Sequence, residues 1–171
     1  AIVQVVRCFR NDNVVHVAGK VDPLSDISVI QTELALADLN TVEKVIQREI
    51  KKAGAGNKES ARLCDLLEKV AAHLNQAEPV RSMGLDKEQM ELIRPLCLIT
   101  AKPTMYVANV SDDGFTDNPL LDQLTQYAES QKAPIVAICA AIESEIVELP
   151  EEDRAEFLSD MGMDEPGLNR L

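Results

Sequence analysis

Aromatic side chains are scarce in this chain of 171 residues, which has no tryptophan, two tyrosines and three phenylalanines. An aromatic content of 3% disfavours a β-sandwich core or a base-stacking surface for single strands, and it suits long aliphatic helices. Basic residues are also few, since 17 of them face 29 acidic residues and the formal net charge is −12. A broad surface that neutralises phosphates is therefore disfavoured, and we expect no DNA partner.

The sequence offers little for a metal or disulfide framework. Cys8, Cys64, Cys97 and Cys139 are widely separated and lack C-x-x-C spacing. We interpret them as buried thiols of a reducing compartment, and with two histidines in the chain we predict no metal site. No apolar run approaches membrane-spanning length and no signal peptide is visible, so we expect a cytoplasmic protein without a membrane partner.

Runs rich in valine and isoleucine predict strands. Ile2 to Cys8 shows little polar alternation, which is typical of a strand covered on both faces in a parallel sheet. Similar runs occur at Thr104 to Ala108 and at Pro134 to Ile138. The second and third runs are close enough in sequence to be joined by a single crossover.

That crossover is a predicted helix. Asn118 is a good cap, and Pro119 suits the first helical position. Strand–helix–strand units cross over right-handed into a parallel sheet, so Asn109 and Cys139 should lie at the same carboxyl-end edge. Open α/β sheets bind ligands at this edge. The fold class is therefore predicted as α/β, with its site at this edge.

The segment between the first two strands predicts a helical hairpin. Asp22-Pro23 begins a helix whose apolar stripe continues to Gly54, and Asn57 begins a second helix that runs to Ala77. Roughly thirty residues at about 1.5 Å each make the first helix about 40 Å long, more than a small sheet can cover. Two such helices joined by a short glycine turn form an antiparallel hairpin.

Shorter elements complete the predicted organisation. Asp86 begins a helix that runs to Ile93, and Pro150 begins another that ends at Gly162. Residues 14–20 fit a strand or a site loop, and we favour the loop because it would follow the carboxyl end of a strand.

We divide the chain into part of an α/β domain at residues 1–23, an inserted helical hairpin at 24–100, and the rest of the α/β domain at 101–171. Basic residues concentrate toward the predicted tip of the hairpin, although a solvated lysine-rich tip has the same pattern. These residues are Lys44, Arg48, Lys51, Lys52 and Lys58.

Distinctive residues follow both strands at the predicted edge. They are Asn109-Val110-Ser111-Asp112 and Cys139-Ala140-Ala141. In altered form they resemble the Asn-Lys-x-Asp and Ser-Ala-Lys motifs with which P-loop GTPases recognise a base. Further blocks share the order found in the YchF/Obg-like ATPases, and the chain resembles that family from end to end. The blocks are Val-Arg7-Cys-Phe, Val-His16-Val-Ala-Gly-Lys-Val-Asp22-Pro, Thr32-Glu-Leu-Ala-Leu-Ala-Asp38-Leu, Lys102-Pro-Thr-Met-Tyr and Glu165-Pro-Gly-Leu-Asn-Arg170.

The resemblance implies the C-terminal half of a P-loop GTPase-like parallel-sheet domain, with an inserted antiparallel helical hairpin, or coiled-coil arm. It also implies a nucleotide site that prefers ATP, with GTP as the alternative. Val110 stands where GTPases have lysine, and Asp112 stands where the family pattern has glutamate. The implied base-binding residues are Asn109, Val110, Asp112, Cys139, Ala140 and Ala141.

The resemblance also implies a catalytic histidine. The family has a histidine in the loop after the first strand, instead of the glutamine that orients water in many GTPases. His16 occupies the matching position, so it would orient or deprotonate the water that attacks the γ-phosphate.

The resemblance implies more than this chain contains. A full-length protein of this family would hydrolyse the β–γ phosphate bond of ATP with Mg²⁺ and associate with the ribosome or its large subunit. Gly19-Lys20-Val21 lacks the G-x-x-x-x-G-K-[ST] frame. We expect the phosphate loop and the Mg²⁺ ligands before Ala1 and a TGS domain after Leu171, so this segment alone should be inactive as an ATPase or GTPase.

The residues by themselves leave other interpretations open. Residues 109–114 could form an ordinary polar turn, Ala140 could simply start a helix, and His16 could be structural. His73 should lie on the polar side of the hairpin, in solvent. The rival function is a non-catalytic helical interaction module on an α/β platform. A phosphate loop in the upstream sequence would decide for the hydrolase.

Overall fold

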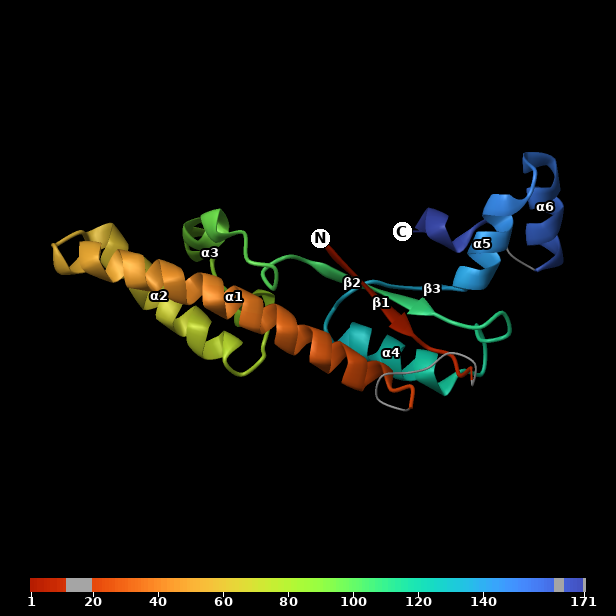
Figure 1. The fold of residues 1–171 in the computed structure, drawn as a ribbon, viewed down its shortest axis with the longest axis horizontal. Helices are drawn as coiled ribbons and strands as arrows, with labels where there is room; N and C mark the ends of the chain where they lie inside the picture. The colour runs from red at the N-terminus through yellow and green to blue at the C-terminus, as the bar shows by residue number, and fades with distance from the viewer. Residues whose placement is uncertain (12–19, 162–164, 171) are drawn as a thin grey trace. The chain divides into compact units, whose positions relative to one another are not determined.

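The computed structural model describes residues 1–11, 20–161 and 165–170, and Figure 1 shows the fold. Most of the predicted loop at 14–20, His16 included, lies outside the described residues. The elements in chain order are β1 (Ile2–Arg7), α1 (Pro23–Gly54), α2 (Lys58–Leu74), η1 (Val80–Met83), α3 (Lys87–Ile93), η2 (Arg94–Leu96), β2 (Thr104–Asn109), α4 (Pro119–Ser130), β3 (Ile135–Ile138), α5 (Ala140–Glu148), α6 (Glu151–Asp160) and η3 (Gly167–Arg170), where η denotes a 3-10 helix.

The chain divides into two compact units. The helical unit comprises Ala1–Ile2 and Ile27–Pro103, and the sheet unit comprises Val3–Asp26 and Thr104–Leu171. No helix of the described part of the chain is long and apolar enough to cross a membrane.

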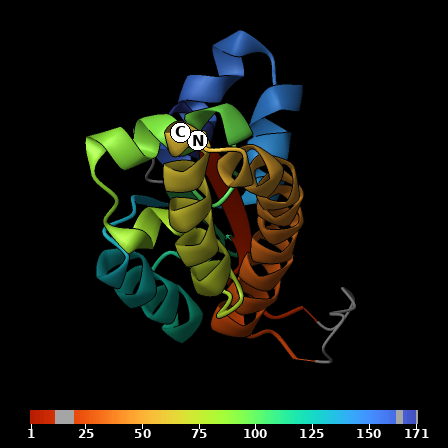
Figure 2. The same ribbon diagram turned by 90° about the vertical axis from the view of Figure 1, so that its left-hand side faces the viewer.

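In the helical unit, α1 and α2 lie side by side and run in opposite directions (Figures 1 and 2). Asn57 caps α2, because its side-chain oxygen accepts the N–H groups of Glu59 and Ser60, both at 3.0 Å. Just before this cap, Gly56 has φ 92°, a conformation that glycine adopts without strain. The turn between the helices is thus set by local chemistry that the sequence already displays.

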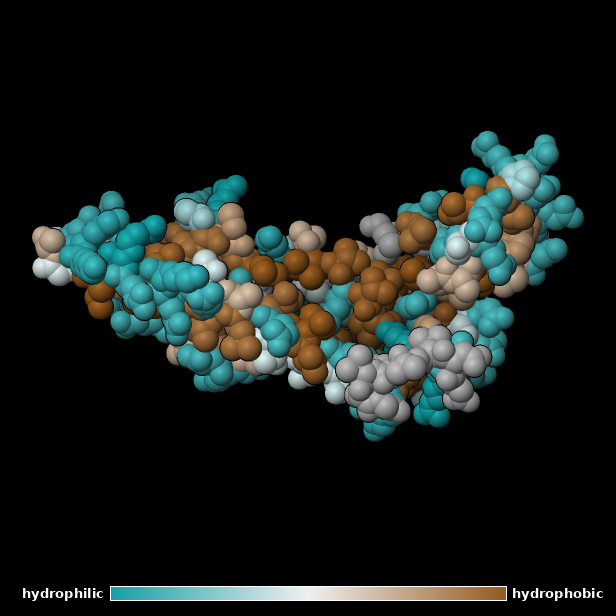
Figure 3. Space-filling model, viewed as in Figure 1, coloured by the Kyte–Doolittle hydropathy of each residue, from teal (hydrophilic) through white to brown (hydrophobic). Residues whose placement is uncertain are grey.

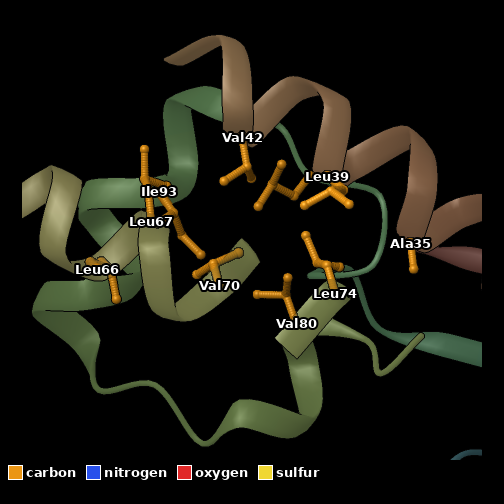
Figure 4. Close-up of a cluster of buried hydrophobic side chains, with 10 residues drawn as sticks. Ala35, Leu39, Val42, Leu66, Leu67, Val70, Leu74, Val80 and Ile93 are labelled. Atoms are coloured by element: carbon orange, nitrogen blue, oxygen red, sulfur yellow. The ribbon is translucent and has the colours of Figure 1, made fainter. Parts of the chain in front are cut away.

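An aliphatic core joins these helices. Leu39 and Val42 of α1 face Leu67, Val70 and Leu74 of α2 (Figure 4). Each such side chain contributes about 1.5–3 kcal/mol when it is fully buried, before the entropy cost of ordering. The same buried cluster takes in Ala35, Leu66, Val80, Ile93 and Leu98.

Two buried carboxylates tie the helical unit together. Asp38 of α1 accepts hydrogen bonds from the N–H groups of Ile99 and Thr100 at 2.8 and 2.7 Å, and from the Thr100 hydroxyl at 2.7 Å. Glu49 accepts one from the Ser60 hydroxyl at 2.9 Å, which links α1 to α2 near their turn. Asp38 thereby fixes α1 to the segment that leads into β2.

In the sheet unit, the strand order is β1-β2-β3 and α4 connects β2 to β3. β2 and β3 are parallel, with Asn109 opposite Ile138. The predicted cap of α4 is confirmed, because the Asn118 side-chain oxygen accepts the N–H groups of Leu120 and Leu121 at 3.1 and 3.3 Å. The predicted α/β class with a parallel sheet is confirmed as well.

The burial predicted for β1 is wrong for the described residues. Val3 and Val5 are 51% and 64% exposed, whereas Val6 on the other face is buried. β1 is an edge strand of the described sheet, and side chains alternate between the two faces of a strand. The described residues cover one face of β1 and leave the other open.

Two further side chains differ from the predictions. Cys97, which follows the short η2 with φ 51°, is exposed, in contrast to the buried Cys8, Cys64 and Cys139. His73 is not simply solvated, because its Nε2 lies 2.9 Å from the Ser82 hydroxyl and 3.2 Å from the Pro79 carbonyl oxygen. The chain folds back beyond α2 and supplies these partners, which helical periodicity alone does not reveal.

Candidate functional site

The predicted site lies at the carboxyl ends of β2 and β3. The Asn109 side-chain oxygen accepts the N–H of Ala140 at 3.1 Å, so the end of β2 is linked directly to the start of α5. The Asn109 carbonyl accepts the N–H of Cys8 at 2.7 Å, and the N–H of Val110 donates to the Ile138 carbonyl at 2.8 Å. One asparagine therefore joins all three strand ends.

Half of the Asn109 amide is already used by this link. The side-chain oxygen is an acceptor, and its partner is Ala140. The amide nitrogen is a donor and has no hydrogen bond within the described part of the chain. Both adenine and guanine present an N7 acceptor on one edge, so this donor can bind either purine without distinguishing them.

Val110 and Asp112, next in the motif, differ in exposure. The Val110 side chain is buried, at 2% exposed, so it cannot lie over a base at the surface as the lysine of the GTPase pattern would. Asp112 is exposed, and its carboxylate makes no hydrogen bond or ion pair among the described residues. A free carboxylate of this kind can accept two hydrogen bonds from a ligand.

The turn after Asn109 has a fixed shape. Gly114 is required because a Cβ there would lie 2.7 Å from the Ser111 hydroxyl oxygen and 3.0 Å from the Ser111 nitrogen. The Asn118 amide donates to the carbonyls of Gly114 and Cys8, both at 2.9 Å. This bridge between the ends of β1 and β2 was not predicted, although the capping role of Asn118 was.

Cys139, Ala140 and Ala141 form the start of α5. Cys139 is buried and makes no side-chain cap, whereas both alanines are exposed. The first N–H groups of a helix have no acceptor within the helix. The Ala140 N–H finds one in Asn109, and side chains as small as alanine leave this turn of backbone accessible to a ligand. Ala140 and Ala141 start a helix, as the alternative interpretation expected, and their role in binding a base stays a prediction.

Six of the seven predicted site residues are brought to one edge, and His16 lies outside the described residues. A cavity of about 420 Å³ opens next to this edge, between the loops that follow β1 and β2. Arg10, Ser111, Asp113 and Gln123 help to line it, but none of the six residues does. The predicted base site is therefore an open edge of the sheet unit, not this cavity.

Metal ligands are not gathered at this edge. Among the residues that the structure describes, no three His, Cys, Asp or Glu side chains come together as a metal site would require. Of the thiols, burial raises the pKa of Cys8 to about 12, so at neutral pH Cys8 is a protonated side chain of the sheet unit and not a nucleophile.

One residue of the region was missed from the sequence. Glu143 of α5 is buried, and its carboxylate accepts the N–H of Gly167 at 2.6 Å. The sequence contains only an indirect signal for a buried glutamate. Glu143 lies one turn into the helix, between Ile142 and Ile146, at a position of the buried face where an apolar residue is expected. Contacts between distant segments, such as this one, leave no periodic trace.

Comparisons with known proteins agree with the resemblance predicted from the sequence blocks. No family model matches the chain. Proteins named "Ribosome-binding ATPase YchF" are 53% identical in Haemophilus influenzae and 50% in Escherichia coli O157:H7 over 171 residues, and 42% in Bacillus subtilis over 174 residues. These matches include 100% of this chain but 47%, 47% and 48% of those proteins.

A solved structure agrees in fold. The structure described as "Structure of the Schizosaccharomyces pombe YchF GTPase" matches 95% of this chain and 46% of its own, with a TM-score of 0.81 and 30% identity. The chain thus spans about half the length of the relatives that it matches, and similarity extends along all of it.

Proposed function

We infer that this chain is a segment of a YchF/Obg-like nucleotide hydrolase, because it resembles the YchF proteins from its first residue to its last. In the whole protein we propose that residues 1–23 and 101–171 form part of the nucleotide-binding domain and that residues 24–100 form an inserted arm. The activity and partners of that whole protein are proposals here, since the chain covers about half of each relative.

The observation that carries this proposal is the hydrogen bond from the Ala140 N–H to the Asn109 side chain. It joins the two loops that follow neighbouring parallel strands, at the edge where open α/β sheets bind ligands. The remaining Asn109 donor and the exposed Ala140–Ala141 backbone then offer a polar rim for a purine. Because Cys139 and Val110 are both buried, we propose that they position this rim and do not touch the base themselves.

We propose that ATP is preferred over GTP. The relatives named above are called ATPases, and the lysine that packs over guanine in GTPases is replaced by the buried Val110. GTP is the second candidate, and the exposed carboxylate of Asp112 favours it, because guanine presents the N1–H and 2-amino donors that such a carboxylate accepts. The solved relative is described as a GTPase.

Hydrolysis in the whole protein would use groups from several segments. We propose that His16 orients or deprotonates the attacking water, as the family resemblance implies. Mg²⁺ would neutralise charge on the phosphates. By the family resemblance, we propose that its ligands lie in the part of the relatives that this chain does not cover, and we expect no hydrolysis by the chain alone.

The proposed partner of the arm is the ribosome, which the names of the relatives include. On the face that Figure 3 shows, hydrophilic residues lie beside the α1–α2 turn, whereas the end itself is white to tan with some hydrophobic residues. Two cations of the predicted tip are already paired, because Arg48 and Lys52 lie 3.1 and 2.9 Å from the Glu49 carboxylate. The tip cations with no ion pair among the described residues are Lys44, Lys51 and Lys58. The rival proposal remains a non-catalytic interaction module.

Replacement of Asn109 tests the base site. In the full-length protein, Asn109→Ala should weaken ATP and GTP together, by about 5- to 30-fold, because it removes a donor common to both complexes and the bond to Ala140. Titration of fluorescent ATP and GTP analogues measures this. Asn40→Ala, an exposed asparagine of α1, is the matched control and should bind as the wild type does. Unchanged affinity of Asn109→Ala would refute the site, and a clear GTP preference in the wild type would refute the adenine assignment.

A further inference from the structure

The block Glu165 to Arg170 was recognised from the sequence, but the proposed function gives it no role. In the structure its Gly167–Arg170 part forms η3, which packs beside β3 in the sheet unit. β3 leads directly into Cys139 and the first residues of α5, Ala140 and Ala141, at the candidate base site. The block therefore lies next to the edge at which a purine is proposed to bind.

A buried carboxylate makes the connection. Glu143 is 5% exposed, and its Oε1 accepts the Gly167 N–H at 2.6 Å. Burial of a carboxyl group costs free energy unless hydrogen bonds compensate it. The bond from Gly167 supplies such compensation and links Glu143 to η3.

Only glycine fits at the other end of this bond. Gly167 is buried, and a Cβ there would lie 2.8 Å from the Glu143 Oε1 and 2.9 Å from the Ile138 Cγ2. Both distances are too short for a real methyl group, so a side chain at this position would displace the Glu143 carboxyl group or the Ile138 side chain. Ile138 is the residue opposite Asn109 in the sheet.

The same helical turn supplies the N–H that Asn109 accepts. The Glu143 N–H donates to the Cys139 carbonyl at 3.0 Å, which closes the first turn of α5. Within that turn the Ala140 N–H donates to Asn109. Cys139 provides no side-chain cap, so the bond between Glu143 and Gly167 is an additional restraint on the position of this turn.

We propose that Glu143 is a positioning residue for the purine site: through Gly167 it holds the first turn of α5 so that Ala140 meets Asn109. The same bond couples purine binding to the block Glu165 to Arg170. This inference rests on the proposed function, because it requires a base at that edge. Coupling of this kind is reciprocal, so a bound purine stabilises the contact between η3 and Glu143 to the same extent.

Substitutions in the full-length protein test the positioning role. Glu143→Ala should weaken ATP and GTP alike by about tenfold, and Gly167→Ala should do the same. Glu143→Gln keeps an oxygen that can accept the Gly167 N–H, so it should stay within about threefold of the wild type. Glu145→Ala, an exposed glutamate on the same helix, is the control and should have no effect.

A double variant separates positioning from general destabilisation. If Glu143 acts through the Ala140–Asn109 bond, Asn109→Ala combined with Glu143→Ala should bind no worse than Asn109→Ala alone. Additive losses would overturn the inference, as would wild-type affinity in Glu143→Ala. If Glu143→Ala does not fold, the nucleotide affinities of Gly167→Ala and Glu143→Gln are compared instead, and the first should be about tenfold weaker while the second stays close to the wild type.

Amide exchange of the wild-type protein tests the coupling directly. Saturation with the ATP analogue should slow hydrogen exchange in the peptide that contains Gly167, and unchanged exchange there would overturn the coupling. If the wild type binds neither nucleotide, the proposed function and this inference both fail. If Asn109→Ala weakens binding while the Glu143 variants do not, the inference fails and the proposed function stands.

Discussion

Asp38 should be the polar residue whose loss most weakens the helical unit. It is 2% exposed and accepts three hydrogen bonds, from the N–H groups of Ile99 and Thr100 and from the Thr100 hydroxyl. Asp38→Ala leaves two backbone N–H donors without an acceptor, and each such donor should lower the free energy of unfolding by about 1–3 kcal/mol. The Thr100 hydroxyl also accepts the N–H of Val80 at 3.2 Å, and this hydrogen bond does not involve Asp38, so we expect it to remain in Asp38→Ala.

The expected cost of Asp38→Ala is therefore about 2–6 kcal/mol of unfolding free energy. Asp38→Asn keeps one acceptor oxygen and should cost about half as much. Urea denaturation followed by circular dichroism measures both, with Glu43→Ala, an exposed acid of the same helix, as a control that should change stability by less than about 0.5 kcal/mol. If Asp38→Ala and the control shift the midpoint equally, the carboxylate is not an anchor. The comparison requires similar denaturant slopes for all variants.

Three other predictions address pH, catalysis and the partner. The hydrogen bonds from Lys52, Ser60 and Arg48 lower the pKa of Glu49 from 4.5 to about 2. The ionised Glu49 therefore stabilises the fold above pH 4.5, and this stabilisation is lost as the pH falls toward 2. In acid-unfolding curves, Glu49→Gln should lack the loss of stability between these two pH values. His16→Ala should slow single-turnover hydrolysis in the full-length protein and leave nucleotide affinity nearly unchanged, since a group that positions water acts on the transition state; equal turnover would make His16 structural. Reversal of the unpaired tip lysines to glutamate should weaken co-sedimentation with ribosomes and flatten its salt dependence, without changing hydrolysis in the absence of ribosomes. The tip variant changes Lys44, Lys51 and Lys58, and its control reverses three exposed lysines elsewhere, Lys69, Lys87 and Lys132. Equal binding by the two variants would place the contact away from the tip.

Features of the fold that depend on residues close together in the chain could be predicted from the sequence. The valine-rich strands and the Asn118 cap predict a strand–helix–strand unit that places Asn109 and Cys139 at one sheet edge, because each step depends on residues close in the chain. The start of α2 at Asn57 follows from the same kind of local hydrogen bonding. The family resemblance came from ordered blocks, whose agreement with the comparisons does not depend on any one motif.

Contacts between distant segments could not be predicted in the same way. The bond from Gly167 to Glu143 joins residues 24 apart, and although Glu143 interrupts the apolar face of α5, nothing in the sequence identifies Gly167 as its partner. The partners of His73 come from a fold-back beyond α2. The coverage of β1 depends on what packs against the strand, and a valine-rich run has the same composition with one face covered or two. The role of His16 stays a prediction, because that residue lies outside the described part of the chain.

The edge position of β1 affects how this chain behaves in concentrated solution. β2 lies on one side of β1, and among the described residues no strand lies on the other, so β1 is the edge strand of the described sheet, the position from which strands pair with other chains. The six residues Ile-Val-Gln-Val-Val-Arg are rich in β-branched side chains, carry one charge and contain no proline or glycine. Segments of this composition promote edge-to-edge aggregation and fibril growth. The exposed Val3 and Val5 add an apolar face to that edge, so concentration of the isolated chain favours self-association through β1.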